Sequence, residues 1–111
     1  MSTKKDIRAR FRDAVFKRAQ YVCQGIGCLF ESTSKKAQEE LDSHHICDRT
    51  LLPTGGYVLE NGIALCKVCH EKAEMWHRTK GADYIWTPDE LYALIGSSYE
   101  TAWEASEKLS G

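Results

Sequence analysis

The sequence predicts a small α+β domain in which a metal-binding segment holds a strand pair and a helix together, with further helices on either side. Three observations point to this class: a chain of only 111 residues, helical signals near both ends, and two cysteine pairs around a stretch with strand character. A chain of this length forms one domain, residues 1–111. Because its core is thin, a bound metal would add stability that the core alone lacks.

The N-terminal segment, residues 1–20, is basic and helical. Ile7, Phe11 and Val15 recur at helical spacing, which predicts a helix over about residues 5–20. The segment carries seven lysines and arginines against two aspartates, a net charge of +5.

The middle of the chain predicts a hairpin followed by a helix. Residues 31–40 lack an apolar stripe and indicate a loop, with a helical turn near 35–40. Residues 41–46 can form a strand, 52–57 contain Pro53 and a glycine pair and should turn, and 58–66 should return as the second strand. Residues 67–79 lack glycine and proline and predict a helix, which Gly81 would end.

The C-terminal segment, residues 82–111, is acidic, with six carboxylates against one lysine and a net charge of −5. Thr87, Pro88 and Glu90 form a helix-start pattern with a capping box. Two short helices, or one helix broken near residues 96–98, should follow. We expect this segment to pack against the N-terminal helix.

The chain shows no sign of a membrane span or a secretory signal. It has no run of about 18 apolar residues, and its charged start is not followed by an apolar stretch. We therefore expect an intracellular protein, in which cysteines bind metal more often than they form disulfides.

Four of the five cysteines form two pairs, Cys23 with Cys28 and Cys66 with Cys69. These spacings let two thiolates converge on one ion, and Gly25 and Gly27 allow the first loop to curl tightly. The four cysteines together predict one structural Zn²⁺ site that joins the end of the first helix to the start of the helix over 67–79.

Two adjacent histidines, His44 and His45, lie in the predicted first strand, where neighbouring side chains face opposite sides. One of them can therefore face the following helix and the other a groove. On that helix His70 and Glu74 share a face, and His77 lies on much the same face. A strand histidine with His70 and Glu74 would make a three-ligand metal site, and the second strand histidine would be a candidate general base.

The order C-x4-C … D-S-H-H-I … G-G-Y … E-N-G-I-A-L-C-K-V-C-H-x3-E resembles that of the HNH endonucleases, whose site is a ββα-metal unit. The resemblance covers residues 14 to about 77. It implies a zinc-stapled HNH core over residues 21–80 and a metal-dependent endonuclease that hydrolyses DNA phosphodiester bonds, nicking one strand because it has one active site. It also implies a catalytic divalent ion, Mg²⁺, Mn²⁺ or Zn²⁺, besides the structural zinc.

The resemblance assigns roles to individual residues of this chain. His45 corresponds to the general base, His44 to the first ligand of the catalytic metal, and His70 to the ligand at the helix start. Asn61 corresponds to the asparagine that ties the hairpin together and holds the loop of the base.

Two further positions, Glu74 and Asp42, match the family pattern less closely. Glu74 stands where many members carry a last histidine; a carboxylate is also a metal ligand, so Glu74 is the expected third ligand with His77 as its rival. Asp42 is expected to orient a ligand from outside the metal's own coordination sphere.

Affinity for DNA would come from contacts between basic side chains and phosphates. Arg49 follows the histidine strand and is placed to reach the scissile phosphate, whereas the acidic C-terminal segment would repel phosphate. The candidates are Lys4, Lys5, Arg8, Arg10, Arg12, Arg49, Lys72, Arg78 and Lys80.

Two other functions stay open on the sequence alone. The chain could be a non-catalytic zinc module that binds nucleic acid or a protein partner, or a nuclease directed at RNA. Small stand-alone HNH proteins occur in phages, where some assist genome packaging. We therefore expect a cytoplasmic protein of a bacterial host, encoded by the bacterium or a virus, with a packaging or other protein as a further partner.

Overall fold

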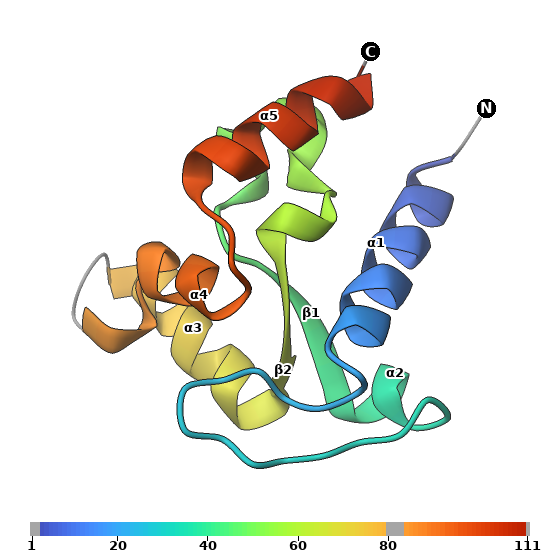
Figure 1. Ribbon diagram of the computed structural model, residues 1–111, viewed down its shortest axis with the longest axis vertical. Helices are drawn as coiled ribbons and strands as arrows, with labels where there is room; N and C mark the ends of the chain where they lie inside the picture. The colour runs from blue at the N-terminus through green and yellow to red at the C-terminus, as the bar shows by residue number, and fades with distance from the viewer. Residues whose placement is uncertain (1–2, 80–83, 111) are drawn as a thin grey trace.

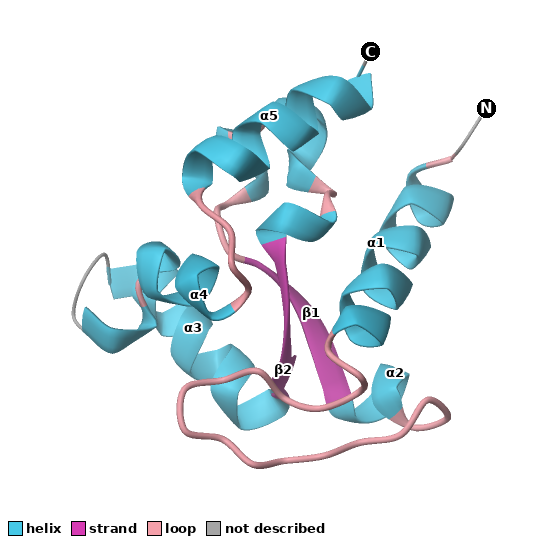
Figure 2. Cartoon of the chain, viewed as in Figure 1, coloured by secondary structure: helices cyan, strands magenta, loops and turns pink. Residues whose placement is uncertain are grey.

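A two-stranded antiparallel sheet lies at the centre of the structure, and helices pack around it (Figures 1 and 2). The computed structural model describes residues 3–79 and 84–110. This arrangement confirms the predicted small α+β class. Among these residues, no helix combines the length and the apolar character needed to cross a membrane.

Helix α1, Lys4–Arg18, matches the predicted N-terminal helix. Thr3 caps it by accepting a hydrogen bond from the Asp6 N–H, and the Asp6 carboxylate accepts one from the Thr3 N–H. Its apolar face is buried against both strands. A Cβ atom at Gly62 would lie 2.4 Å from Val15 Cγ2, so the helix approaches the sheet closely because residue 62 is glycine.

The sheet pairs β1, Leu41–His45, with β2, Gly62–Cys66. A four-residue helix α2, Ala37–Glu40, precedes β1 in the predicted position. Residues 46–61 connect the strands through three short turns of 3₁₀ helix: η1 (Arg49–Leu51), η2 (Pro53–Gly56) and η3 (Leu59–Asn61). The second strand was expected from residue 58 but begins at Gly62, because residues 59–61 turn and bring Asn61 into the interior.

Helix α3, Lys67–Thr79, follows β2 directly and agrees with the predicted helix. Gly81, the expected stop, lies outside the described residues. The helix packs on both strands, so residues of β1 and α3 meet across one face of the hairpin.

The C-terminal segment contains the single turn η4, Tyr84–Trp86, and the helices α4, Pro88–Leu94, and α5, Tyr99–Ser110. The Thr87 hydroxyl caps α4 by accepting a hydrogen bond from the Glu90 N–H. The expected packing of this segment on α1 was wrong. Helix α5 packs mainly on η2 and η3, because the apolar face of α1 is already occupied by the sheet (Figure 1).

Candidate active site

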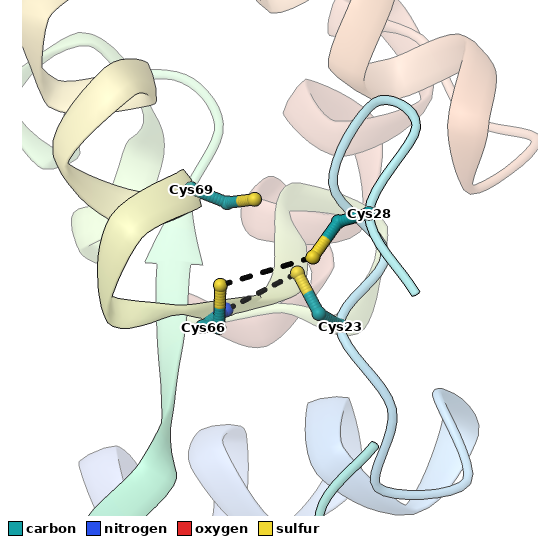
Figure 3. A group of neighbouring side chains, drawn as sticks. All are labelled: Cys23, Cys28, Cys66 and Cys69. Atoms are coloured by element: carbon teal, nitrogen blue, oxygen red, sulfur yellow. Dashed lines mark hydrogen bonds between the residues drawn. The ribbon is translucent and has the colours of Figure 1, made fainter. Parts of the chain in front are cut away.

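Four cysteine side chains converge where the loop after α1 meets the junction of β2 and α3 (Figure 3). The sulfur atoms of Cys23, Cys28, Cys66 and Cys69 lie within 4.8 Å of one another, and all four cysteines are free thiols. The backbone N–H groups of Gly25 and Cys66 both donate to the Cys23 sulfur. The four predicted ligands therefore come together, and this cluster could hold a metal ion.

The loop between Cys23 and Cys28 closes tightly around the cluster. A Cβ atom at Gly25 would lie 2.6 Å from the Cys69 sulfur, so the sequence needs glycine there to let the second pair approach. Burial raises the pKa of the Cys23 and Cys69 thiols, whereas a backbone hydrogen bond from Phe30 lowers the pKa of Cys28. Metal binding at this cluster must therefore displace protons.

A second cluster lies between β1 and α3. One ligand atom each from His44, His70 and Glu74 lies within 4.8 Å of the other two. Glu74 Oε1 is 3.2 Å from His44 Nδ1 and 3.3 Å from His70 Nε2. His44 is 1% exposed, and its Nδ1 has the Glu74 carboxylate as a close polar neighbour, although neither ring nitrogen makes a well-aligned hydrogen bond among the described residues. A cation held by this set would bind a ring nitrogen of the buried imidazole and the carboxylate together.

The protonation states and the surroundings of these residues also suit a cation. Burial lowers the pKa of His44, and the contact with His44 lowers the pKa of Glu74 to about 2, which gives a neutral imidazole and an ionised carboxylate at pH 7. Asp42 Oδ2 is 3.0 Å from His70 Nδ1, and its other oxygen accepts from Lys67 Nζ at 2.7 Å. Asp42 thereby fixes the His70 ring with Nε2 turned towards Glu74.

His77 lies beside this set without joining it. Its ring centroid is 5.4 Å from that of His44, but it is not one of the residues whose ligand atoms converge. Of the two rival third ligands, Glu74 is therefore the one that the geometry favours.

His45 faces away from His44, towards α1, as the alternation of side chains along a strand requires. Its ring stacks on Phe11 with centroids 4.5 Å apart, and Tyr57 packs edge-on against it at 4.7 Å. Burial, together with the nearby Arg49 guanidinium, lowers the pKa of His45 to about 4, so the ring is neutral at pH 7. Its Nε2 is buried without a hydrogen-bond partner among the described residues.

Asn61 is fully buried and holds the connection between the strands. Its Oδ1 accepts hydrogen bonds from the Cys47 N–H at 2.9 Å and the Tyr92 hydroxyl at 2.7 Å. Its Nδ2 donates to the carbonyl oxygens of Cys47 and Gly56, both at 3.2 Å. The side chain thus ties the residues that follow His45 to the end of the connection.

His45 and the histidine cluster, which consists of His44, His70 and Glu74, border one hollow of about 370 Å³. It is lined by Ser43, His44, His45, Asp48, Arg49, Thr50, His70, Glu74 and His77. Its two sides differ, because one presents potential metal ligands and the other a neutral imidazole beside an arginine. The arrangement can place a proton acceptor and a cation against the same small molecule or group.

The basic side chains expected to contact DNA lie in separate parts of the structure. Lys5, Arg8, Arg12 and Arg49 line a hollow of about 750 Å³ next to His45, and Lys4 lines a neighbouring one. The Lys72 Nζ lies 5.8 Å from the centroid of the Trp86 ring. Arg10 and Arg78 are exposed elsewhere, and Lys80 lies outside the described residues.

Comparison with protein-family models, with curated proteins and with solved structures finds no match for this chain.

Tyr57 and Tyr92 bond to groups of the site, although neither of them was predicted from the sequence to have a role. Tyr57 is visible in the sequence only as the residue after a glycine pair, whereas Tyr92 reaches Asn61 from a distant helix and leaves no local signal.

Proposed function

We propose that the chain is a metal-dependent endonuclease of the HNH type that hydrolyses DNA phosphodiester bonds, with His45 as the general base. The observation that carries this proposal is that His45 lines the same hollow as His44, His70 and Glu74. A proton acceptor and a ligand set for a divalent ion therefore border one space that a phosphodiester group can enter. The succession of β1, β2 and α3 behind that hollow supports the assignment to a ββα-metal core.

His44, His70 and Glu74 would hold the catalytic ion, Mg²⁺, Mn²⁺ or Zn²⁺. When bound, the ion supplies Lewis-acid stabilisation of the charge that develops on the phosphodiester. The four cysteines would hold a structural Zn²⁺, since a closed set of four thiolates is typical of such sites.

The remaining chemistry belongs to the side chains of this chain. His45, neutral at pH 7, accepts a proton from the water that attacks phosphorus. Asn61 keeps the connection after His45 in place, and Arg49 at the edge of the hollow attracts the negative phosphate. With one such site per chain, the expected product is a nick in one strand.

Supercoiled plasmid incubated with the purified protein and Mg²⁺, Mn²⁺, Ni²⁺ or Zn²⁺ tests this proposal. We expect open-circular product with at least one metal, loss of product in His70→Ala, and retention in Glu71→Ala, an exposed carboxylate of α3 outside the ligand set. Absence of cleavage by the parent protein with every metal would contradict the proposal and favour the non-catalytic zinc module. A parallel incubation with RNA tests whether the protein cleaves RNA in place of DNA.

A further inference from the structure

Tyr57 holds two arginines from different parts of the chain beside His45. Its hydroxyl accepts a hydrogen bond from Arg49 Nη1 at 2.7 Å and another from Arg8 Nε at 3.3 Å. Burial alone would raise the pKa of Tyr57, but the bonds from Arg49 and Arg8 outweigh it and lower the pKa. The ring is fixed by edge-on contacts with His45 and Phe11.

Tyr57, Arg8 and Arg49 retain hydrogen-bond donors that are not bonded to any described residue. The Tyr57 hydroxyl donates no hydrogen bond to any described residue, although its oxygen accepts two. Within the described part of the chain, neither Arg8 nor Arg49 forms an ion pair with a carboxylate, whereas Arg12 is paired with Asp13 at 3.1 Å. Two guanidinium groups and one hydroxyl thus remain able to bind an anion.

The hollows around Tyr57 form a basic path that leads to the proposed active site. Arg8, Arg49 and Tyr57 line both the 750 Å³ hollow and its 430 Å³ neighbour, while His45 and Arg49 line both the larger hollow and the one that contains the histidine cluster. The residues that line the two outer hollows include no aspartate or glutamate. Their cations are Lys4, Lys5, Arg8, Arg12 and Arg49.

We infer that Tyr57 and Arg8, together with Arg49 at the border of the two sites, bind a second phosphate of a nucleic-acid strand, next to the phosphate that is cleaved at His45. This inference rests on the proposed function for the cleaved phosphate. The phosphodiester backbone is the ligand that fits, because the path is cationic throughout and its anchors are planar donors suited to phosphate oxygens. A strand bound here would extend from the histidine cluster across Tyr57 towards the start of α1.

Binding without cleavage tests this inference. Fluorescence anisotropy of labelled 12-nucleotide DNA and RNA, single-stranded and duplex, is measured at several salt concentrations without added divalent metal. The variants are Tyr57→Phe, Arg8→Ala and their combination. The matched control is Lys17→Ala, which removes an exposed charge from the same helix away from the path.

Tyr57→Phe keeps the ring but removes the hydroxyl, so affinity should fall about 2- to 10-fold on the preferred nucleic acid with little change in salt dependence. Arg8→Ala should weaken binding and also reduce the slope of log K against log salt by about 1. In the combined variant the two losses should be less than additive, because the groups share one hydrogen bond.

Parental affinity of Tyr57→Phe on all four ligands would overturn the inference. So would an equal loss in Lys17→Ala and Arg8→Ala, which would indicate general electrostatic attraction only. The sugar preference follows from comparing the DNA and RNA arms. The binding experiment involves no turnover. A protein that binds these ligands but does not cleave plasmid would refute the proposed function and leave this inference standing, so the two failures are distinguishable.

Discussion

Replacing Asn61 with aspartate is a sharp test of how the connection between the strands is held. The side chain is 0% exposed and makes four hydrogen bonds, two accepted by Oδ1 and two donated by Nδ2. Aspartate has nearly the same shape and can still accept from the Cys47 N–H and the Tyr92 hydroxyl. Its second oxygen, however, would face the carbonyl oxygens of Cys47 and Gly56 in place of a donor.

Asn61→Asp should destabilise the fold through the carbonyl groups of Cys47 and Gly56, to which Nδ2 now donates. Two buried carbonyl groups lose their donor, and each such loss costs about 1–3 kcal/mol. The free energy of unfolding should therefore fall by about 2–6 kcal/mol, a large share of the roughly 5–15 kcal/mol typical of native domains. Tyr92→Phe removes one accepted bond and leaves both carbonyl groups bonded, so it should cost only about 1 kcal/mol.

Urea unfolding at pH 7, followed by circular dichroism at matched metal content, measures both effects. The expected order of midpoints is parent, then Tyr92→Phe, then Asn61→Asp at the lowest urea concentration. If Asn61→Asp unfolds at the same urea concentration as Tyr92→Phe, the two donated bonds contribute nothing extra and this explanation of the connection is wrong.

The remaining predictions concern the two metal clusters. Elemental analysis of the parent should show about one zinc per chain. Cys66→Ser should lose this zinc and melt at a lower temperature, whereas a disulfide among the four cysteines in the reduced parent would refute the site. Gly25→Ala should weaken the same site, since its Cβ would lie 2.6 Å from the Cys69 sulfur. Because burial raises the pKa of the Cys23 and Cys69 thiols, protons compete with the metal, and zinc affinity measured against a chelator should rise from pH 6 to pH 8. Glu74→Ala should weaken the binding of the divalent metal at the histidine cluster by about 10–100-fold, and a high metal concentration should partly restore its cleavage activity. His77→Ala should keep the metal affinity and cleavage activity of the parent. The opposite pattern would make His77 the third ligand.

Local features of the fold were predictable because their causes lie close together in the sequence. The apolar spacing of Phe11 and Val15, the Thr87 cap and the two cysteine pairs each act over a few residues. Alternation along a strand likewise predicted that His44 and His45 face opposite ways, which the structure confirms.

Features that depend on distant contacts were missed. The second strand starts late because Asn61 turns inward to bond Cys47 and Gly56, and no local pattern specifies that turn. The close packing of α1 on the sheet depends on Gly62, a steric effect between segments far apart in the chain, and α5 packs instead on η2 and η3. The joining of Arg8 and Arg49 by Tyr57 is equally non-local.

Single-turnover cleavage of supercoiled plasmid by His45→Ala and by the parent tests most directly the claim that His45 is the base of a metal-dependent nuclease. Both proteins are compared at saturating metal and equal plasmid binding. We predict that the variant binds normally but cleaves about 10²–10⁴-fold more slowly, because a general base acts in the transition state. Cleavage by His45→Ala at the parental rate would contradict the claim.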